Sequence, residues 1–89
     1  MSRSVRIVIA EPSEIIRRGM IGVLKRIRSF DGDVVEVDDT DHLRPALARH
    51  APDILFVNPS MVGKLSIVQV KKEASNPAMK CVALQSSLA

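Results

Sequence analysis

Several residue types are scarce in this chain of 89 residues, and each scarcity excludes a class of protein. The single cysteine, Cys81, excludes an internal disulfide and a zinc centre built from several thiolates. Tryptophan and tyrosine are absent and there are only two phenylalanines, which argues against an aromatic platform for stacking single-stranded nucleic acid. No apolar run approaches the length of about 20 residues that a transmembrane helix needs.

The motifs of several enzyme classes are also missing. The loop Glu11-Pro12-Ser13 precedes the first predicted helix and contains no glycine, so it is unlike the loops that hold nucleotide phosphates. The two histidines, His42 and His50, fall on or near the second predicted helix, away from any nucleophile at a strand end. We therefore expect no enzymatic activity, no cofactor and no bound metal.

The overall composition is that of a folded globular chain. Hydrophobic residues make up 46% of the sequence and charged residues 26%. The length fits one domain, residues 1–89. The first four residues lead directly into a strand-like run without a signal-peptide cleavage pattern, so we expect a cytoplasmic protein that does not bind a membrane.

Short β-branched runs alternate with amphipathic segments along the chain. The apolar runs predict strands over residues 3–10, 34–37, 53–57 and 80–84. Caps and helical spacing predict helices over residues 13–28, 41–50 and 64–74, although part of the last segment also has the pattern of a strand. The order β-α-β-α-β-α-β implies parallel strands joined by right-handed crossovers, and hence an open three-layer α/β sheet.

The sequences of the first two predicted helices allow more detailed predictions. The first predicted helix has one apolar stripe, formed by Ile16, Met20, Val23 or Leu24, and Ile27. Its two glycines, Gly19 and Gly22, each destabilise a helix by about 1 kcal/mol relative to alanine, so we expect them to allow close packing on the sheet. In the second helix Pro45 belongs in the first turn, which predicts a start later than Asp41.

In an open parallel sheet the functional crevice lies outside the carboxyl ends of the strands. The loops expected to meet there are Glu11-Pro12-Ser13, Asp38-Asp39, Asn58-Pro59-Ser60 and Gln85-Ser86-Ser87. Clustered acids at this edge would suit metal-assisted phosphoryl transfer to a carboxylate.

At these loops the sequence resembles the receiver domain of response regulators, of the kind that heads two-component transcription regulators with a helix-turn-helix output. The run VRIVIA followed by Glu11 is similar to the family's first strand and acidic pair, and IIRRGM (residues 15–20) to the start of its first helix. APDILFV (51–57) is similar to the strand that carries the phosphoacceptor, and KCVAL (80–84) to the fourth strand. The resemblance implies a CheY-like (flavodoxin-like) fold with strand order 2-1-3-4-5 and a role in phosphorelay signal transduction.

The chemistry of the family does not carry over residue by residue. The corresponding positions form a degenerate phosphorylation pocket: Glu11 and Pro12 for the acidic pair, Asn58 for the phosphoacceptor, and Gln85, followed by Ser86, for the hydroxyl residue. A neutral amide is not a competent nucleophile, and a single carboxylate is a poor set of ligands for Mg²⁺. We therefore expect a receiver-like regulatory module that is not phosphorylated and that acts through protein contacts.

The chain ends after the fourth predicted strand, without the family's fifth β/α unit and its lysine. It is either a shortened form of a longer regulator or a short natural one. The fourth strand would be an open edge, which predicts a homodimer paired at that strand. DNA would be contacted only through an effector domain that is not present here.

Two other functions stay open. A conventional phosphorelay receiver would use Glu11 or another acid as the acceptor. A small nucleic-acid-binding protein would use a basic contact face on the first helix, formed by Arg17, Arg18, Lys25 and Arg26, within a net charge of +3. The plainer interpretation of that face is a solvated helix surface.

Overall fold

A computed structural model of the chain describes residues 4–27, 31–62, 70–72, 74 and 76–84. Its strands are β1 (Val5–Ala10), β2 (Gly32–Val37), β3 (Ile54–Val57) and β4 (Lys80–Ala83). Its helices are α1 (Glu14–Arg26), α2 (Thr40–His50) and the 3-10 turn η1 (Pro59–Met61). The third predicted helix lies for the most part outside the described residues, as do Gln85 and Ser86.

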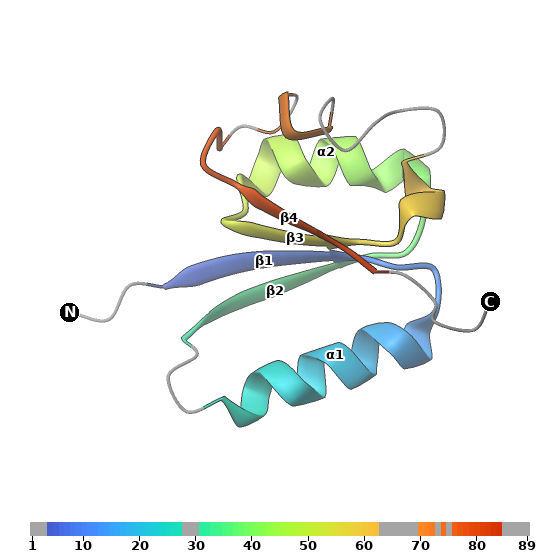
Figure 1. The fold of residues 1–89 in the computed structure, drawn as a ribbon, viewed down its shortest axis with the longest axis vertical. Helices are drawn as coiled ribbons and strands as arrows, with labels where there is room; N and C mark the ends of the chain where they lie inside the picture. Colours follow the sequence, from blue (N-terminus) through green and yellow to red (C-terminus); the bar gives the residue numbers. More distant parts are fainter. Residues whose placement is uncertain (1–3, 28–30, 63–69, 73, 75, 85–89) are drawn as a thin grey trace.

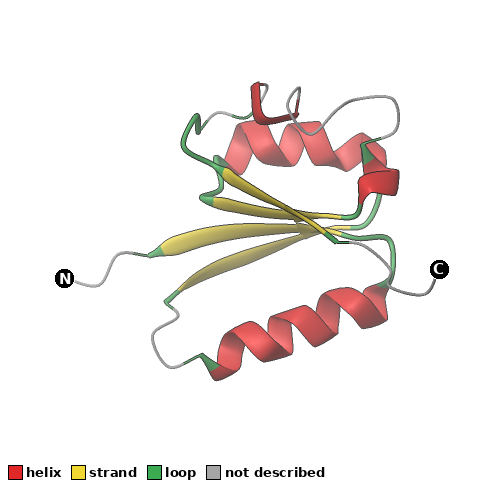
Figure 2. Cartoon of the chain, viewed as in Figure 1, coloured by secondary structure: helices red, strands yellow, loops and turns green. Residues whose placement is uncertain are grey.

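The strands form one sheet in the order β2-β1-β3-β4, and every pair is parallel. Helix α1 lies on one face, and α2 with η1 on the other (Figures 1 and 2). The predicted parallel α/β sheet is thus confirmed, and the strand order is compatible with a flavodoxin-like fold. Among the described residues, no helix has the length and apolar character needed to cross a bilayer.

The main core lies between the sheet and α2. Side chains alternate along a strand, so Val8 of β1 and Leu55 of β3 point to the same face, where they pack with Leu43 and Leu47 of α2. The neighbouring residues of β1, Ile7 and Ile9, point to the α1 face and are also buried. Burial on both faces explains why the β1 sequence is almost continuously apolar.

One glycine is required by a close approach of two strands. Gly32 pairs with Val5 at the start of β1 and β2, and a Cβ added to it would collide with the Val5 carbonyl oxygen. The expected role of Gly19 and Gly22 is wrong. Both are exposed, and a Cβ at either position would meet nothing within 4 Å, so neither allows close packing.

The caps set the helix starts. The Ser13 hydroxyl accepts from the Ile16 amide and begins α1, as predicted. Asp39 accepts from the His42 amide and begins α2 at Thr40, so Pro45 lies inside the helix and not in its first turn. The prediction of a later start was wrong because the N-cap is Asp39, two residues before Asp41.

The predicted apolar stripe of α1 is only partly covered. Met20 and Leu24 are partly buried, whereas Ile16, Val23 and Ile27 are 48%, 60% and 46% exposed. The side chain of α1 that is buried is Arg17, which is not among the predicted residues of the stripe.

Candidate functional site

Backbone hydrogen bonds join the carboxyl ends of three neighbouring strands of the described sheet, β2, β1 and β3. The amide of Glu11 donates to the Val37 carbonyl at 3.0 Å, linking the end of β1 to the end of β2. The amide of Asn58 donates to the Ala10 carbonyl at 2.8 Å, linking the end of β3 to β1. These bonds extend the strand ladders by one residue, and they set Glu11 and Asn58 next to each other at the predicted crevice.

The Glu11 carboxylate is buried, and each of its oxygens accepts a hydrogen bond. Only 3% of the residue is exposed. Its Oε1 accepts from the side-chain amide of Asn58 at 2.8 Å, and its Oε2 accepts from the backbone amide of Ser13 at 2.7 Å. A buried carboxylate is tolerated when its oxygens are hydrogen-bonded in this way.

Asn58 uses both ends of its amide group. Its Nδ2 donates to Glu11, and its Oδ1 accepts from the backbone amide of Ser60 at 3.0 Å, which caps the 3-10 turn η1. The side chain therefore forms the turn expected of an Asn-Pro pair and also joins that turn to β1. A carboxylate at this position would accept from Ser60 equally well but would have no proton to donate to Glu11.

Arg17 is the residue of this edge that sequence reasoning missed. Its Nη1 donates to the carbonyls of Glu11 at 2.6 Å and Pro12 at 3.2 Å, and its Nε donates to Glu36 Oε1 of β2 at 3.1 Å. Only 8% of the residue is exposed. Arg17 precedes Met20 by three residues and Leu24 by seven, so the helical repeat places it on the same side of α1 as these two. This spacing is the feature of the sequence that could have indicated its burial.

One member of the predicted basic contact face, Arg17, is not at the surface, whereas the other three are exposed. Arg17 is buried beneath α1, and Arg18 forms an exposed ion pair with Glu14 at 3.0 Å, one helical turn away. Lys25 and Arg26 are exposed in the last turn of the helix. Their positive charges interact favourably with the negative end of the helix dipole. This interaction explains their position without a bound ligand.

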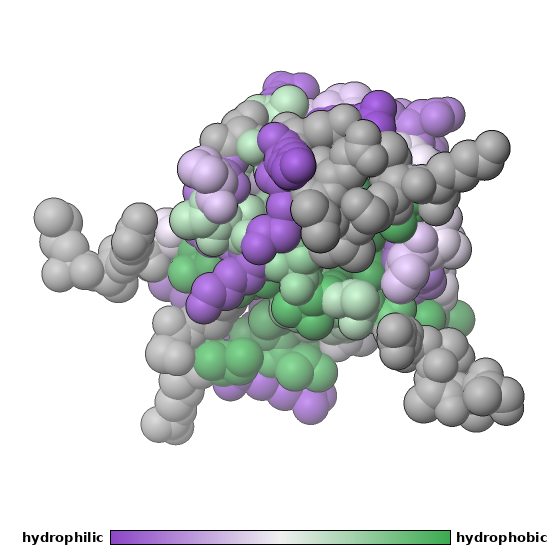
Figure 3. Space-filling view, turned by 45° about the horizontal axis from the view of Figure 1, so that its top comes forward, coloured by the Kyte–Doolittle hydropathy of each residue, from purple (hydrophilic) through white to green (hydrophobic). Residues whose placement is uncertain are grey.

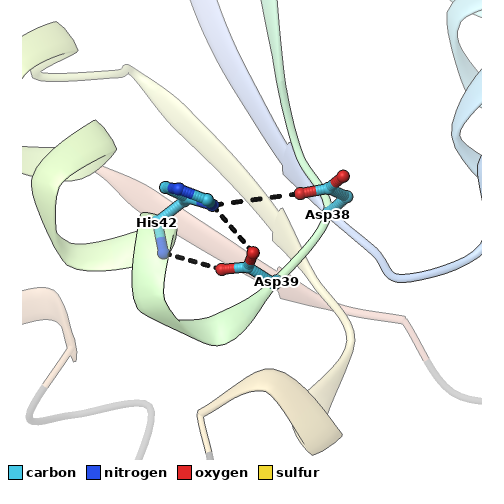
Figure 4. A group of neighbouring side chains, drawn as sticks. All are labelled: Asp38, Asp39 and His42. Carbon is cyan, nitrogen blue, oxygen red and sulfur yellow. Dashed lines mark hydrogen bonds and ion pairs between the residues drawn. The ribbon is translucent and has the colours of Figure 1, made fainter.

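A second polar group lies at the end of β2. Asp38, Asp39 and His42 bring one ligand atom each to within 4.8 Å of one another (Figure 4). His42 Nδ1 lies 2.8 Å from Asp39 Oδ2 and 4.0 Å from Asp38 Oδ1, while Asp39 Oδ1 caps α2. All three are exposed, and helix capping by Asp39 together with its contact to the His42 ring accounts for the geometry.

Of the predicted pocket, the structure brings Glu11 and Asn58 into contact and places Pro12 beside them, with its carbonyl held by Arg17. Gln85 and Ser86 lie outside the described residues. Comparison of the chain with protein-family models, with curated proteins and with solved structures found no match.

Proposed function

We propose that this chain is a receiver-like regulatory module of the two-component type, that it is not phosphorylated at the acceptor position, and that it acts through contacts with other proteins. The proposal joins the resemblance of the sequence to the geometry of the carboxyl edge. Its place in a transcription regulator and its cytoplasmic location stay predictions.

The contact between Asn58 and Glu11 carries the proposal. The residue at the acceptor position is neutral, and it serves as a hydrogen-bond donor to the one carboxylate at the ends of β1 and β3. Phosphoryl transfer to an acid needs an accessible anionic oxygen and a cation held by several acids. The described residues at these two strand ends offer one buried carboxylate, whose oxygens already accept from Asn58 and Ser13.

The alternative functions fit these contacts less well. Phosphorylation of Glu11 would disrupt the hydrogen bond of the oxygen that takes up the phosphoryl group, and it would need the side chain to leave a site where it is 3% exposed. Nucleic-acid binding by the basic face would lose Arg17, which is buried, and would have to compete with Glu14 for Arg18.

A second copy of the chain is the partner that we propose for the edge of the sheet. Strand β4 is the last in the order, and its Val82 is 42% exposed. Edge strands of this kind pair with other chains unless they are covered. Size-exclusion chromatography with light scattering tests this pairing: it predicts a dimer at micromolar concentration, and a monomer would contradict it.

Phosphorylation is tested with acetyl phosphate and Mg²⁺, followed by intact-mass spectrometry at neutral pH. A receiver with an aspartate acceptor, treated in parallel, provides the positive control. The proposal predicts no phosphoryl adduct on this chain. An adduct on an aspartate or glutamate, identified by its loss on treatment with hydroxylamine, would overturn the proposal.

A further inference from the structure

Two cations of α1 face a cleft beside β2. Figure 3 shows apolar side chains gathered in the lower half of the molecule, with hydrophilic ones below them. The apolar side chains of α1 line a groove next to Phe56 of β3, whereas Arg18 and Lys25 line a separate cleft of about 720 Å³ next to β2. The other lining residues of this cleft are Ile21, Gly22, Asp31, Gly32, Asp33, Val34 and Glu36. Helix α1 therefore has an apolar side toward β3 and a charged side toward β2.

The cleft opens along the free edge of β2, which is the first strand in the order of the sheet. The carbonyls of Asp31 and Val37 accept from amides of β1. Because the hydrogen-bonding direction alternates along a strand, the odd-numbered residues of β2 bond to β1 and the even-numbered ones face away from it. The residues that face away are Gly32, Val34 and Glu36. All three line the cleft, and no other described strand pairs with them.

Gly22 keeps this cleft wide. It lines the cleft, and a Cβ added to it would meet nothing within 4 Å. A glycine inside a helix costs about 1 kcal/mol of stability relative to alanine, and no packing contact requires it here. Residues that lower stability without a packing reason are typical of places where function needs them. The missing side chain leaves room between α1 and the edge of β2.

Two charges of opposite sign at the cleft have no partner. Among the residues that the structure describes, the side chains of Lys25 and Asp33 form neither an ion pair nor a hydrogen bond. The cross-strand neighbour of Asp33 is Arg6, which donates to the His50 carbonyl instead. Since side chains alternate along β2 and Val34 lies on the α1 face, Asp33 points to the α2 face. A strand added at this edge would meet a positive charge on one face and a negative charge on the other.

An extended segment of another protein matches these features. Its backbone offers alternating amides and carbonyls to the residues of β2 that face away from β1. Its side chains point alternately to the two faces of the sheet. An acidic residue facing Lys25 and a basic neighbour facing Asp33 would therefore pair with both unpartnered charges.

A second copy of the chain matches them less well. Its own β2, with the sequence GDVVEV, carries acids but no base that could pair with Asp33. In a two-fold pair joined at β2, the α1 helix of each copy would bring Arg18 and Lys25 toward the same residues of the other copy, because both line this side of the helix. Like charges placed against each other oppose association.

We propose that the edge of β2 and the cleft between it and α1 form a docking site for an extended segment of a partner protein in which acidic and basic residues alternate. The inference rests on the proposed function only in that the module acts through protein contacts. It uses neither the pair formed by Glu11 and Asn58 nor the edge at β4. A failed docking test is therefore distinguishable from a failed phosphorylation or dimerisation test.

The test is a binding titration with a capped peptide of about eight residues in which glutamate and lysine alternate, which spans roughly 26 Å when extended. A matched peptide carries glutamine at every position. We expect the charged peptide to bind at least about tenfold more tightly than the uncharged one. Bound peptide is expected to slow hydrogen exchange at the amides of Gly32, Val34 and Glu36, because these amides become donors to the added strand.

Two glycine variants separate the two sides of α1. Gly22→Leu fills the cleft and is expected to weaken binding of the charged peptide at least about tenfold. Gly19→Leu is the matched control: it lines the apolar groove on the other side of the same helix and leaves binding unchanged. Both substitutions raise helix propensity and add a Cβ that meets nothing within 4 Å, so neither variant is expected to unfold the protein.

A charge reversal tests the pairing of charges. Lys25→Glu is expected to weaken binding, because the same sign then lies on both faces of the β2 edge. The double variant Lys25→Glu with Asp33→Lys is expected to restore it. An added strand can turn by half a rotation about its long axis, which exchanges the side chains on its two faces.

Several results would overturn the proposal. These are no binding of the charged peptide, equal binding of both peptides, a loss in Gly19→Leu as large as in Gly22→Leu, or unchanged hydrogen exchange at the three amides in the bound state. Self-association of the chain that Gly22→Leu abolishes would contradict the proposal as well, because it would assign the edge of β2 to a second copy.

Discussion

The side-chain amide of Asn58 donates to the carboxylate of Glu11 across 47 residues of sequence, and this bond reinforces the backbone bond that links the ends of β1 and β3. Because Glu11 also accepts from Ser13 and Asn58 also accepts from Ser60, the two side chains connect two loops as well as two strands. The carboxyl edge of the sheet is thus stabilised by a pair of side chains in which the amide of Asn58 donates and the carboxylate of Glu11 accepts.

Replacing Arg17 with alanine is expected to destabilise the fold by about 2–3 kcal/mol. The substitution leaves the carbonyls of Glu11 and Pro12 without their donor and removes the ion pair with Glu36. Chemical denaturation measures the loss. Arg18→Ala is the control, since its ion pair is exposed and is expected to change stability by less than about 0.5 kcal/mol. Equal losses in the two variants would show that Arg17 is not a structural residue.

The thiol of Cys81 is expected to react slowly. Burial raises its pKa above the ordinary value, and the positive charge of Lys71 opposes the shift in part. The thiolate is the reactive form, so alkylation by iodoacetamide at mildly basic pH should be slower in the folded protein than in the denatured chain, and slower still in Lys71→Ala. Faster alkylation of the folded protein would contradict this assignment.

The same shift has a consequence for stability. The folded state favours the neutral thiol of Cys81. The contribution of this preference to the free energy of unfolding is therefore complete at pH values below the pKa of the thiol in the unfolded chain. This contribution to stability is lost as the pH rises through the higher pKa of the thiol in the folded state. The variant Cys81→Ala should therefore lose less stability at basic pH than the parent chain does.

Gly22→Ala is expected to stabilise the protein by about 0.5–1 kcal/mol, because alanine has the higher helix propensity and less backbone freedom in the unfolded chain. A Cβ at this position meets nothing within 4 Å. Thermal unfolding measures the gain. Gly32→Ala is the contrasting variant: the Val5 backbone fills the space that the new methyl group would need, so a loss is expected there. A loss in Gly22→Ala would contradict the account of α1.

The alternation of apolar runs and amphipathic segments predicted the parallel sheet and the meeting of Glu11 with Asn58, because both follow from chain connectivity. It could not predict the burial of Arg17. That burial depends on carbonyl acceptors which take their places only when α1, β1 and β2 come together. A hydrophobic stripe likewise shows which residues of α1 are apolar, but not whether a neighbour covers them, and Val23 is 60% exposed.

The amide of Asn58 stabilises the carboxyl edge of the sheet by donating to the buried carboxylate of Glu11. Asn58→Asp places a second carboxylate 2.8 Å from the first and removes the donor. We expect a loss of about 2–3 kcal/mol at neutral pH, which becomes smaller as the pH falls and one of the two carboxyls binds a proton. The new carboxylate can still accept from Ser60, so the cap of η1 is retained.

The double variant Glu11→Gln with Asn58→Asp exchanges donor and acceptor and keeps the net charge of the parent chain. Its new amide can donate across the contact while its oxygen accepts from Ser13. The most direct measurement is therefore the free energy of unfolding at neutral pH of the parent, the two single variants and the double variant. The double variant is expected to recover at least half of the stability lost in Asn58→Asp. A double variant whose loss equals the sum of the two single losses would contradict it.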